Sequence, residues 1–218
     1  MPDSKPDIEL LATFPTAFYT DVYMRLGMRG WISGLQPVSP LSGRRLVGPA
    51  LTVRYLPVRG RQASPTTLYE VIRSAQAGDV LAIQAPYPGI ALVGDLATSC
   101  ARAQGLAGIV LDGYIRDVEE VKNCGLPVFC RGISMEHPPL IELHDWGATI
   151  ECGGAQIRGG DFLVGDDDGV VVVPPEELDE VVNHLGQMKF IEEELKEAIS
   201  REAPLESIQA LFRRKTDS

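Results

Sequence analysis

GDLATSCARAQGLAGIVLDGYIRD, residues 94–117, carries the clearest indication of the fold. Its first half, 94–105, predicts a helix, with Asp95 suited to the N-cap position and Gly105 just past the last turn. Its second half contains LAGIVLDG (106–113), a short apolar run of the buried-strand type. A similar run, DVLAIQAP (79–86), precedes the helix. A strand, a helix and a strand with short connections predict a parallel βαβ unit.

The segments on either side extend this α/β pattern. The whole chain, residues 1–218, is predicted to be a single α/β domain, and residues 176–218 are predicted to be its helical C-terminal appendage. The 133–140 segment is rich in proline and is expected to be a loop. The further predicted helices are 16–27, 66–78 and 116–125, and the further predicted strands are 46–57, 126–132 and several within 148–173.

Charge and composition exclude some classes of function. The 218 residues carry a net charge of −10, and the basic residues are scattered, which argues against binding to a nucleic acid backbone. No apolar run approaches the roughly 20 residues that span a bilayer, and the first residues lack the features of a signal peptide. The four cysteines show no metal-ligand spacing. We expect a soluble, cytoplasmic protein with no membrane and no nucleic acid partner.

The predicted helix start at Gly94 and Asp95 is a candidate anion site. A helix N-terminus offers unpaired backbone N–H groups and the positive end of the helix dipole. Gly94 would let a ligand approach the backbone, and the following residues are small. The alternative is that Asp95 serves only as a helix cap.

Arg116 and Asp117 follow the strand that ends near Asp112, so the βαβ unit brings them to the sheet edge where the Gly94 helix starts. An arginine can hold a carboxylate through two parallel hydrogen bonds, and an aspartate can ligate a hard divalent cation. Together they suit a 2-oxo acid, whose adjacent carbonyl and carboxylate oxygens chelate a metal. The alternative is an exposed ion pair of negligible value.

Other signals point to no chemistry. The acids of GDDDGVVVV (165–173) lack the alternation of a calcium loop and are expected to be solvated acids on a turn before a buried strand. His137, His144 and His184 share no metal-ligand spacing. There is no G-x-S-x-G, P-loop or G-x-G-x-x-G motif.

Taken in order, four stretches resemble the family shared by the regulator of ribonuclease activity A and the class II 4-hydroxy-4-methyl-2-oxoglutarate aldolases. They are GPALTV (48–53), the opening stretch 94–117, GLPVFCRG (125–132) and GDFLVGDDDGVVVVP (160–174). The resemblance implies a three-layer β/β/α sandwich, related to swivelling phosphohistidine domains, with C-terminal helices. It also implies a homotrimer or homohexamer with active sites between subunits.

The resemblance also implies a role for each site residue. Arg116 would bind the pyruvyl part of the substrate and stabilise its enolate, and Asp117 would be the protein ligand of Mg²⁺ or Mn²⁺. Asp95 would orient a water used in proton transfer. Backbone N–H groups of Gly94, Asp95, Leu96 and Ala97 would hold the substrate carboxylate. A glutamate of the neighbouring subunit would also contribute, and the candidates are Glu192, Glu193 and Glu194.

The function implied by the resemblance is metal-dependent retro-aldol cleavage. The substrate would be a 4-hydroxy-2-oxo dicarboxylic or tricarboxylic acid, such as 4-carboxy-4-hydroxy-2-oxoadipate, and the products pyruvate and a second 2-oxo acid. Decarboxylation of oxaloacetate is expected as a side activity. The alternative is a non-catalytic protein-binding regulator of ribonuclease activity. Such regulators usually lack the acid after the arginine, so Asp117 favours an enzyme. Arg131, His137 and the loop 86–89 are candidates to line the pocket for the 4-substituent.

Overall fold

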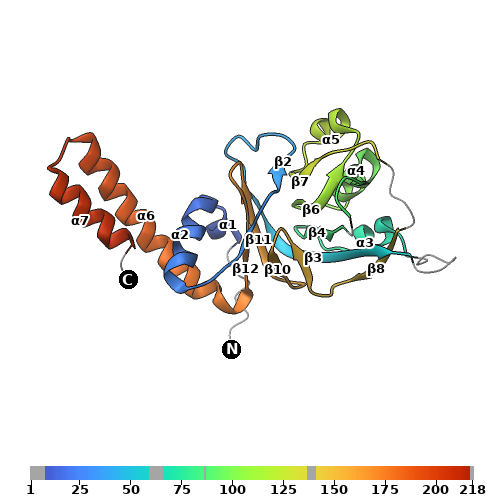
Figure 1. Cartoon of the computed structure of the whole chain (residues 1–218), viewed down its shortest axis with the longest axis horizontal. Coiled ribbons are helices and arrows are strands. Elements are labelled where there is room, and N and C mark those ends of the chain that lie inside the picture. Colours follow the sequence, from blue (N-terminus) through green and yellow to red (C-terminus); the bar gives the residue numbers. More distant parts are fainter. Residues whose placement is uncertain (1–7, 59–65, 86, 137–140, 217–218) are drawn as a thin grey trace.

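The computed structural model of the chain describes residues 8–58, 66–85, 87–136 and 141–216, and its centre is the long strand β3 (Leu46–Pro57). This strand joins two parts of one mixed sheet (Figure 1). On one side it runs parallel to β4 (Val80–Gln84), which continues to β6 (Gly108–Ile115) and β7 (Val128–Ile133), all parallel. On the other side it pairs antiparallel with β11 (Phe162–Asp166), followed by β12 (Gly169–Val173).

Shorter strands complete this sheet. β1 (Trp31–Ile32) pairs with β12, and β2 (Gln36–Pro37) pairs with β7. β5 (Ala91–Val93) runs parallel to β6, and β8 (Ile141–Trp146) runs antiparallel to the end of β3. β9 (Ile150–Cys152) and β10 (Ala155–Ile157) form a separate hairpin.

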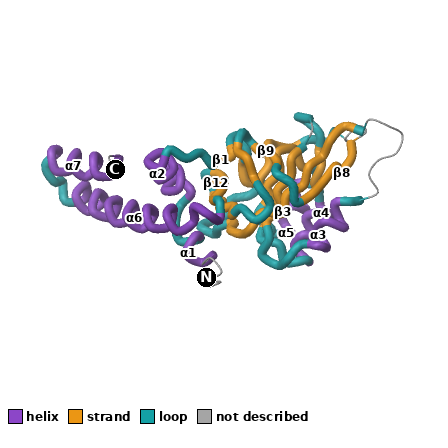
Figure 2. The backbone as a smooth tube through the Cα atoms, turned by 90° about the horizontal axis from the view of Figure 1, so that it is seen from below, coloured by secondary structure: helices purple, strands orange, loops and turns teal. Residues whose placement is uncertain are grey.

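Helices cover two faces of the strands. α3 (Leu68–Ser74), α4 (Asp95–Ala103) and α5 (Val118–Cys124) connect the parallel strands and lie together on one side of them (Figure 2). α1 (Ile8–Leu11), α2 (Thr16–Leu26) and the first part of α6 (Leu178–Ser200) pack beside β11 and β12. A short 3-10 turn, Pro175–Glu177, precedes α6. The rest of α6 and the antiparallel α7 (Leu205–Thr216) project from the body (Figure 1). No helix in the described ranges combines the length and apolar character that a membrane crossing requires.

The side chains of the parallel strands point alternately into two of the three hydrophobic cores. Leu81 and Ile83 of β4 face the core shared with α3, α4 and α5, whereas Val80 and Ala82 face the core shared with β9–β12. Successive side chains of a strand point to opposite faces, so one strand can serve both cores. The third core lies between α1, α2 and α6 and the outer face of β11–β12. The mixed α/β fold predicted from the sequence, with strands packed on strands and helices on the far face, is therefore confirmed.

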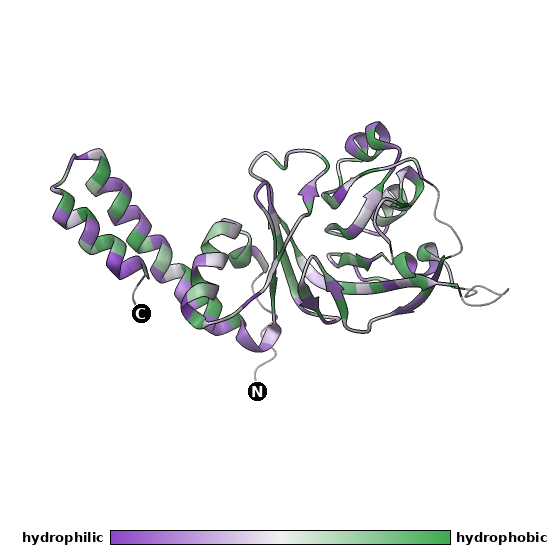
Figure 3. Ribbon diagram, viewed as in Figure 1, coloured by the Kyte–Doolittle hydropathy of each residue, from purple (hydrophilic) through white to green (hydrophobic). Residues whose placement is uncertain are grey.

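The amphipathic pattern of the C-terminal helices is visible along their length. Figure 3 shows hydrophobic and hydrophilic residues alternating around α6 and α7. The buried residues of α6 recur at helical spacing and are Val181, Leu185, Met188, Ile191, Leu195 and Ala198. The first three pack in the core shared with α2, which attaches the base of α6 to the body.

Three expectations about local structure were wrong. Asp95 is the first residue of α4 rather than its cap, because the extended Gly94 takes the N-cap position and its carbonyl accepts from Thr98 N–H at 3.1 Å. β6 does not end at Gly113 but continues to Ile115, so Arg116 follows the strand directly. The acids after Gly165 are not all solvated, since Asp166 is 4% exposed.

Asp166 is buried because it binds the start of α2. Its carboxylate accepts hydrogen bonds from Thr16 N–H at 2.9 Å and Thr16 Oγ1–H at 2.6 Å, and from Asp168 N–H at 3.0 Å. Arg45 Nε lies 3.7 Å from Asp166 Oδ2. Its neighbour Asp167 is exposed but accepts a hydrogen bond from Leu41 N–H at 2.6 Å. These acids hold distant segments together.

Candidate active site

A cavity of about 370 Å³ lies where β5, α4 and the end of β6 meet the end of β3 and β8. It is the place where the α4 N-terminus and the Arg116–Asp117 pair come together, as the sequence predicts. The lining residues are Tyr55, Thr66, Thr67, Leu68, Tyr69, Ala91, Leu92, Val93, Gly94, Leu96, Ala97, Arg116, Asp117, Ile141, Glu142 and Leu143.

The two charged residues after β6 lie at the edge of this cavity. Arg116 N–H donates to Val93 O at 3.0 Å, which ties the chain after β6 to the end of β5. Arg116 Nε is 3.6 Å from Asp117 Oδ2, and the side chains are 51% and 43% exposed. An ion pair this exposed contributes little to stability. Both groups therefore remain accessible to a ligand.

Asp117 has an uncommon backbone conformation. Its φ of 54° and ψ of 47° lie in the left-handed region, although it is not a glycine. Its carbonyl accepts from Val121 N–H at 2.9 Å in the first turn of α5, and its Oδ2 accepts from Asp95 N–H at 3.3 Å. The left-handed turn thus directs the carboxylate back toward the start of α4. Strain of this kind is often found at functional sites.

Gly94 is required by close packing against the charged pair. A Cβ added at this position would overlap Asp117 Oδ2 and would lie 3.2 Å from Arg116 Cγ. Only glycine lets the α4 start approach Asp117 this closely. By helix geometry, the N–H groups of Asp95, Leu96 and Ala97 have no acceptor within α4. The site therefore combines a cation, a carboxylate and the positive end of a helix dipole.

The three residues after Gly94 differ in where their side chains lie. Leu96, which is 70% exposed, and Ala97, which is 6% exposed, both line the cavity. The Asp95 carboxylate is not part of the described lining, and its Oδ1 accepts from Ser99 Oγ at 3.1 Å on the outer side of α4. The structure therefore brings Gly94, Leu96, Ala97, Arg116 and Asp117 together and leaves the Asp95 side chain beside them.

The residues present fit a divalent cation that keeps most of its water. Within the described ranges, no group of three His, Cys, Asp or Glu side chains could enclose a metal ion. Asp117 offers a single accessible carboxylate of the hard oxygen type that Mg²⁺ and Mn²⁺ accept, and Mg²⁺ commonly binds through one or two carboxylates plus water and substrate oxygens.

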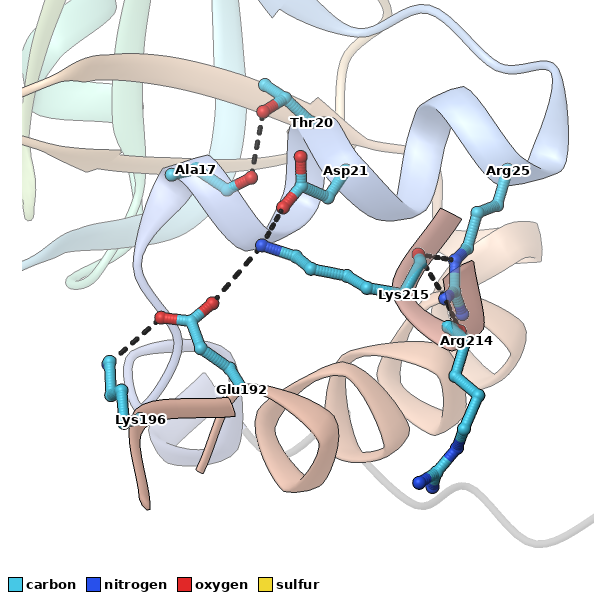
Figure 4. Close-up of polar contacts among 8 residues, drawn as sticks. All are labelled: Ala17, Thr20, Asp21, Arg25, Glu192, Lys196, Arg214 and Lys215. Atoms are coloured by element: carbon cyan, nitrogen blue, oxygen red, sulfur yellow. Dashed lines mark hydrogen bonds and ion pairs between the residues drawn. The ribbon is translucent and has the colours of Figure 1, made fainter. Parts of the chain in front are cut away.

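The candidate glutamates of α6 do not line the cavity of their own chain. Glu192 pairs with Lys196 at 2.9 Å and Lys215 at 3.4 Å, and Glu194 pairs with Arg214 at 2.9 Å (Figure 4 shows the Glu192 contacts). Glu193 is exposed. A contribution to a neighbouring subunit stays a prediction for all three.

The described residues suggested for the 4-substituent do not line the cavity at Arg116, and their role stays a prediction. Arg131 pairs with Asp112 and lines a second cavity of about 180 Å³ with Tyr87 and Pro88, apart from Arg116. His137 and Pro86 lie outside the described residues. The described residues that line the cavity beyond Arg116 include Tyr55, Tyr69 and Glu142, which the sequence did not single out. Tyr55 belongs to β3 and Glu142 to β8, and no local sequence motif predicts that these two strands pair.

Comparison with known proteins identifies the class. The RraA-like family model, Aldolase/RraA, matches residues 16–172, and the chain belongs to this family. Over 90% of its length it is 31% identical to the Halalkalibacterium halodurans protein named "Putative 4-hydroxy-4-methyl-2-oxoglutarate aldolase", 91% of which is matched. It is also 30% identical to Legionella pneumophila protein DlpA over 94% of its own length, and it spans 33% of that longer protein.

Solved structures agree with this assignment. A crystal structure of a Pseudomonas syringae protein superposes with a TM-score of 0.81 at 29% identity, covering 96% of this chain and 99% of the other. Streptomyces coelicolor RraAS2 is described as an unusual member of the RNase ES inhibitor RraA family. It superposes with a TM-score of 0.75 at 30% identity, covering 92% of this chain and 99% of the other. The family therefore includes relatives named as aldolases and relatives named as ribonuclease inhibitors.

Proposed function

We propose that this protein is a divalent-metal-dependent aldolase that cleaves a 4-hydroxy-2-oxo acid to pyruvate and a second carbonyl compound. The names of its relatives support a carbon–carbon lyase. The observation that carries the proposal is the cavity edge where Arg116, Asp117 and the start of α4 meet. An arginine, an accessible carboxylate and a helix N-terminus in one cavity are the groups that a 2-oxo acid and a divalent cation require.

Each residue would have a separate task. The Arg116 guanidinium would hold the substrate carboxylate through two hydrogen bonds and stabilise the negative charge that develops on the enolate. Asp117 would hold Mg²⁺ or Mn²⁺. When bound, the metal would supply Lewis acidity toward the 2-oxo group. The N–H groups of Leu96 and Ala97, which have no acceptor within α4, would bind the remaining carboxylate oxygen, whereas Asp95 N–H donates to Asp117 Oδ2.

The cleavage breaks the bond between C3 and C4 of the substrate. The C4 hydroxyl loses its proton and becomes the carbonyl of the second product, while the bonding electrons pass to C3 and form the enolate of pyruvate. A proton then returns to C3. Asp95, at the start of α4, would turn from Ser99 to orient the water that carries this proton. Loss of carbon dioxide from oxaloacetate passes through the same enolate, so we expect that side activity too.

An amine mechanism has no support in the described part of the cavity. A Schiff base requires a lysine beside the substrate carbonyl. The described lining contains no lysine, and the nearest in sequence, Lys122, lies on the exposed face of α5.

The proposal is tested by measuring pyruvate release from 4-hydroxy-2-oxo acids, with and without EDTA. We expect EDTA to abolish the activity and added Mg²⁺ or Mn²⁺ to restore it. Asp117→Asn should lower kcat/KM by roughly a thousandfold, which is about 4 kcal/mol of lost transition-state stabilisation. Glu120→Gln is the matched control, because Glu120 is an exposed acid on α5 outside the cavity. Full activity in EDTA, or in Asp117→Asn, would disprove the metal mechanism.

The second candidate function is a ribonuclease regulator, favoured by the likeness to RraAS2. It predicts no turnover of any 2-oxo acid and inhibition of a purified RNase E-type nuclease at stoichiometric concentration. In that case Asp117→Asn would inhibit the nuclease as well as the unchanged protein does.

A further inference from the structure

Tyr55, near the end of β3, connects a hydrophobic core to the cavity at Arg116. Its ring packs against the core shared with α3, α4 and α5, on the same face of β3 as Leu51 and Val53. The residue also lines the cavity, whose lining includes Arg116 from the segment after β6. A tyrosine whose ring is anchored in a core and whose end reaches a cavity holds its hydroxyl in a defined place.

The pairing of β3 with β8 keeps Tyr55 on that face. Arg54 lies opposite Asp145. Tyr55 lies opposite Leu143, so His144 of β8 has no opposite residue in β3. Because the extra residue belongs to β8, the alternation of β3 continues through Tyr55. Bulges of this kind are common beside active sites, where they adjust the direction of side chains.

The Tyr55 hydroxyl is a neutral hydrogen-bond donor. Burial raises the pKa of Tyr55 to about 12, and the nearby Tyr69 adds to this effect, so the phenol stays protonated at physiological pH. In the described parts of the chain, no residue forms a hydrogen bond with this hydroxyl. The Thr67 hydroxyl of the same cavity is engaged in the cap of α3, where it donates to Glu70 Oε2 at 3.0 Å.

The C4 oxygen is the polar atom of the substrate that the charged pair leaves without a partner. In the proposed site, Arg116 holds the carboxylate and Asp117 holds the metal at the 2-oxo group. The C4 hydroxyl lies beyond them, on the far side of C3. Since Arg116 and Tyr55 line one cavity from different elements, a single bound molecule can contact both.

We infer that the Tyr55 hydroxyl donates a hydrogen bond to the oxygen on C4 of a 2-oxo acid whose first carboxylate is held by Arg116. This inference deepens the proposed function and rests on it. In cleavage, the C4 hydroxyl loses its proton to the water beside Asp95, and negative charge develops on its oxygen before the C3–C4 electrons pass to C3. The hydrogen bond stabilises that charge, and Tyr55 keeps its own proton. Tyr55 is therefore a catalytic residue of the cleavage step.

The two proposed reactions differ in their need for this donor. Oxaloacetate has no C4 hydroxyl, and its C4 carboxylate leaves as neutral carbon dioxide, so its oxygens lose charge. Tyr55→Phe should lower kcat/KM for cleavage of 4-hydroxy-2-oxopentanoate by roughly a hundredfold. It should change kcat/KM for decarboxylation of oxaloacetate by less than roughly threefold, whereas Asp117→Asn should lower both. Tyr114→Phe is the matched control, because Tyr114 is a half-buried tyrosine outside the described lining, and it should affect neither reaction.

Binding of 2-oxo acids that have no C4 hydroxyl tests the contact separately from cleavage. The matched pair is 2,4-dioxopentanoate and 2-oxopentanoate, which differ by the oxygen on C4. Calorimetric titration of the whole protein with Mg²⁺ present should show roughly tenfold tighter binding of 2,4-dioxopentanoate. Tyr55→Phe should reduce this preference to roughly threefold or less, and Tyr114→Phe should leave it unchanged.

The outcomes distinguish the inference from the proposed function. The inference is overturned if the binding preference is missing from the unchanged protein or persists in Tyr55→Phe. It is also overturned if Tyr55→Phe cleaves at the full rate, or if it loses cleavage and decarboxylation equally, which would indicate a structural role. Each of these results leaves an active aldolase in place. Lack of pyruvate release by the unchanged protein, with the Tyr55-dependent binding preference present, overturns the aldolase alone.

Discussion

Asp117 combines a left-handed backbone conformation with a half-exposed carboxylate that faces the start of α4. Its type and its place after Arg116 are read directly from the chain, and the βαβ pattern predicts that it meets the Gly94 helix start. The left-handed conformation that turns its carboxylate toward α4 could not be predicted, since aspartate adopts this region only occasionally. Gly94 was expected to admit a ligand, and in the structure its missing side chain also makes room for Asp117.

At position 117, stability and function can be separated. Asparagine adopts the left-handed region as readily as aspartate, so Asp117→Asn should change the free energy of unfolding by less than about 0.5 kcal/mol. Asp117→Ala should lower the free energy of unfolding by about 1 kcal/mol, because the left-handed region is unfavourable for a residue whose Cβ carries no polar group. Both variants should lose activity. Urea denaturation checks this prediction. Equal stability of the asparagine and alanine variants would show that alanine adopts the left-handed conformation at position 117 without loss of stability.

Gly94→Ala should damage the site while leaving the fold intact. The new Cβ would push the Asp117 carboxylate away, and a displacement of this kind can cost roughly a hundredfold in activity. The control is Gly186→Ala in α6, where a Cβ meets open space. That change should raise the free energy of unfolding by about 0.5–1 kcal/mol without affecting activity. Kinetics and thermal melts of both variants test this prediction. Full activity of Gly94→Ala would show that the site does not depend on the close approach of Gly94 to Asp117.

At the level of elements, the strongly periodic segments were predictable and the irregular ones were not. The helix at 16–27 and the strand at 46–57 match α2 and β3 closely, because their apolar spacing is clear. The sequence gives no such signal for β8, a short edge strand with mostly polar or half-buried residues. That strand supplies Glu142, so the distal part of the cavity could not be predicted.

Asp166→Ala should be severely destabilising. It would remove the acceptor for both Thr16 N–H and Thr16 Oγ1–H at the start of α2, and it would leave the half-buried Arg45 without its carboxylate. We expect a loss of about 3 kcal/mol in the free energy of unfolding. Asp168→Ala removes an exposed carboxylate of the same turn and should cost less than about 0.5 kcal/mol. Similar losses for the two variants in urea denaturation would contradict this account.

The attachment of α7 to α2 depends on charge. Arg25 Nε donates to Lys215 O at 2.7 Å and Arg25 Nη2 donates to Arg214 O at 2.6 Å, at the negative end of the α7 dipole (Figure 4). Lys215 Nζ lies 3.0 Å from Asp21 Oδ2 and 3.4 Å from Glu192 Oε2. Burial lowers the pKa of Lys215, but the contacts with Asp21 and Glu192 outweigh burial and raise it. Burial raises the pKa of Glu192, but Lys196 and Lys215 outweigh burial and lower it.

Lys215→Met should therefore lose stability in a defined pH range. The Glu192 contribution is present above its unfolded pKa of about 4.3 and is lost as the pH falls through its lowered folded value. The Lys215 contribution is present below its unfolded pKa of about 10.4 and is lost as the pH rises through its raised folded value. The difference from the unchanged protein, up to about 1 kcal/mol, should be greatest between these limits. Urea denaturation across pH measures it, and a pH-independent difference would contradict the assignment.

At the scale of the whole molecule, the site is assembled from segments that are distant in sequence. Residues 94–117 supply the charged pair and the helix start, whereas the ends of β3, α3 and β8 supply the opposite part of the lining. The family resemblance and the βαβ unit predicted the first group and its location. The second group depends on how the end of β3 pairs with β8, with a register shift between Arg54 and Tyr55, which is a tertiary property. Assembly into a homotrimer or homohexamer stays a prediction.

In the proposed site, Asp117 holds the metal and Arg116 holds the 2-oxo acid. The most direct measurement is titration of Mn²⁺ by electron paramagnetic resonance, in the presence and absence of pyruvate. The unchanged protein should bind one Mn²⁺ per chain, and pyruvate should tighten binding. Asp117→Asn should weaken Mn²⁺ binding at least roughly tenfold, whereas Arg116→Lys should retain it and lose the effect of pyruvate. If Asp117→Asn bound Mn²⁺ as tightly as the unchanged protein, with the same response to pyruvate, the proposed site would be wrong.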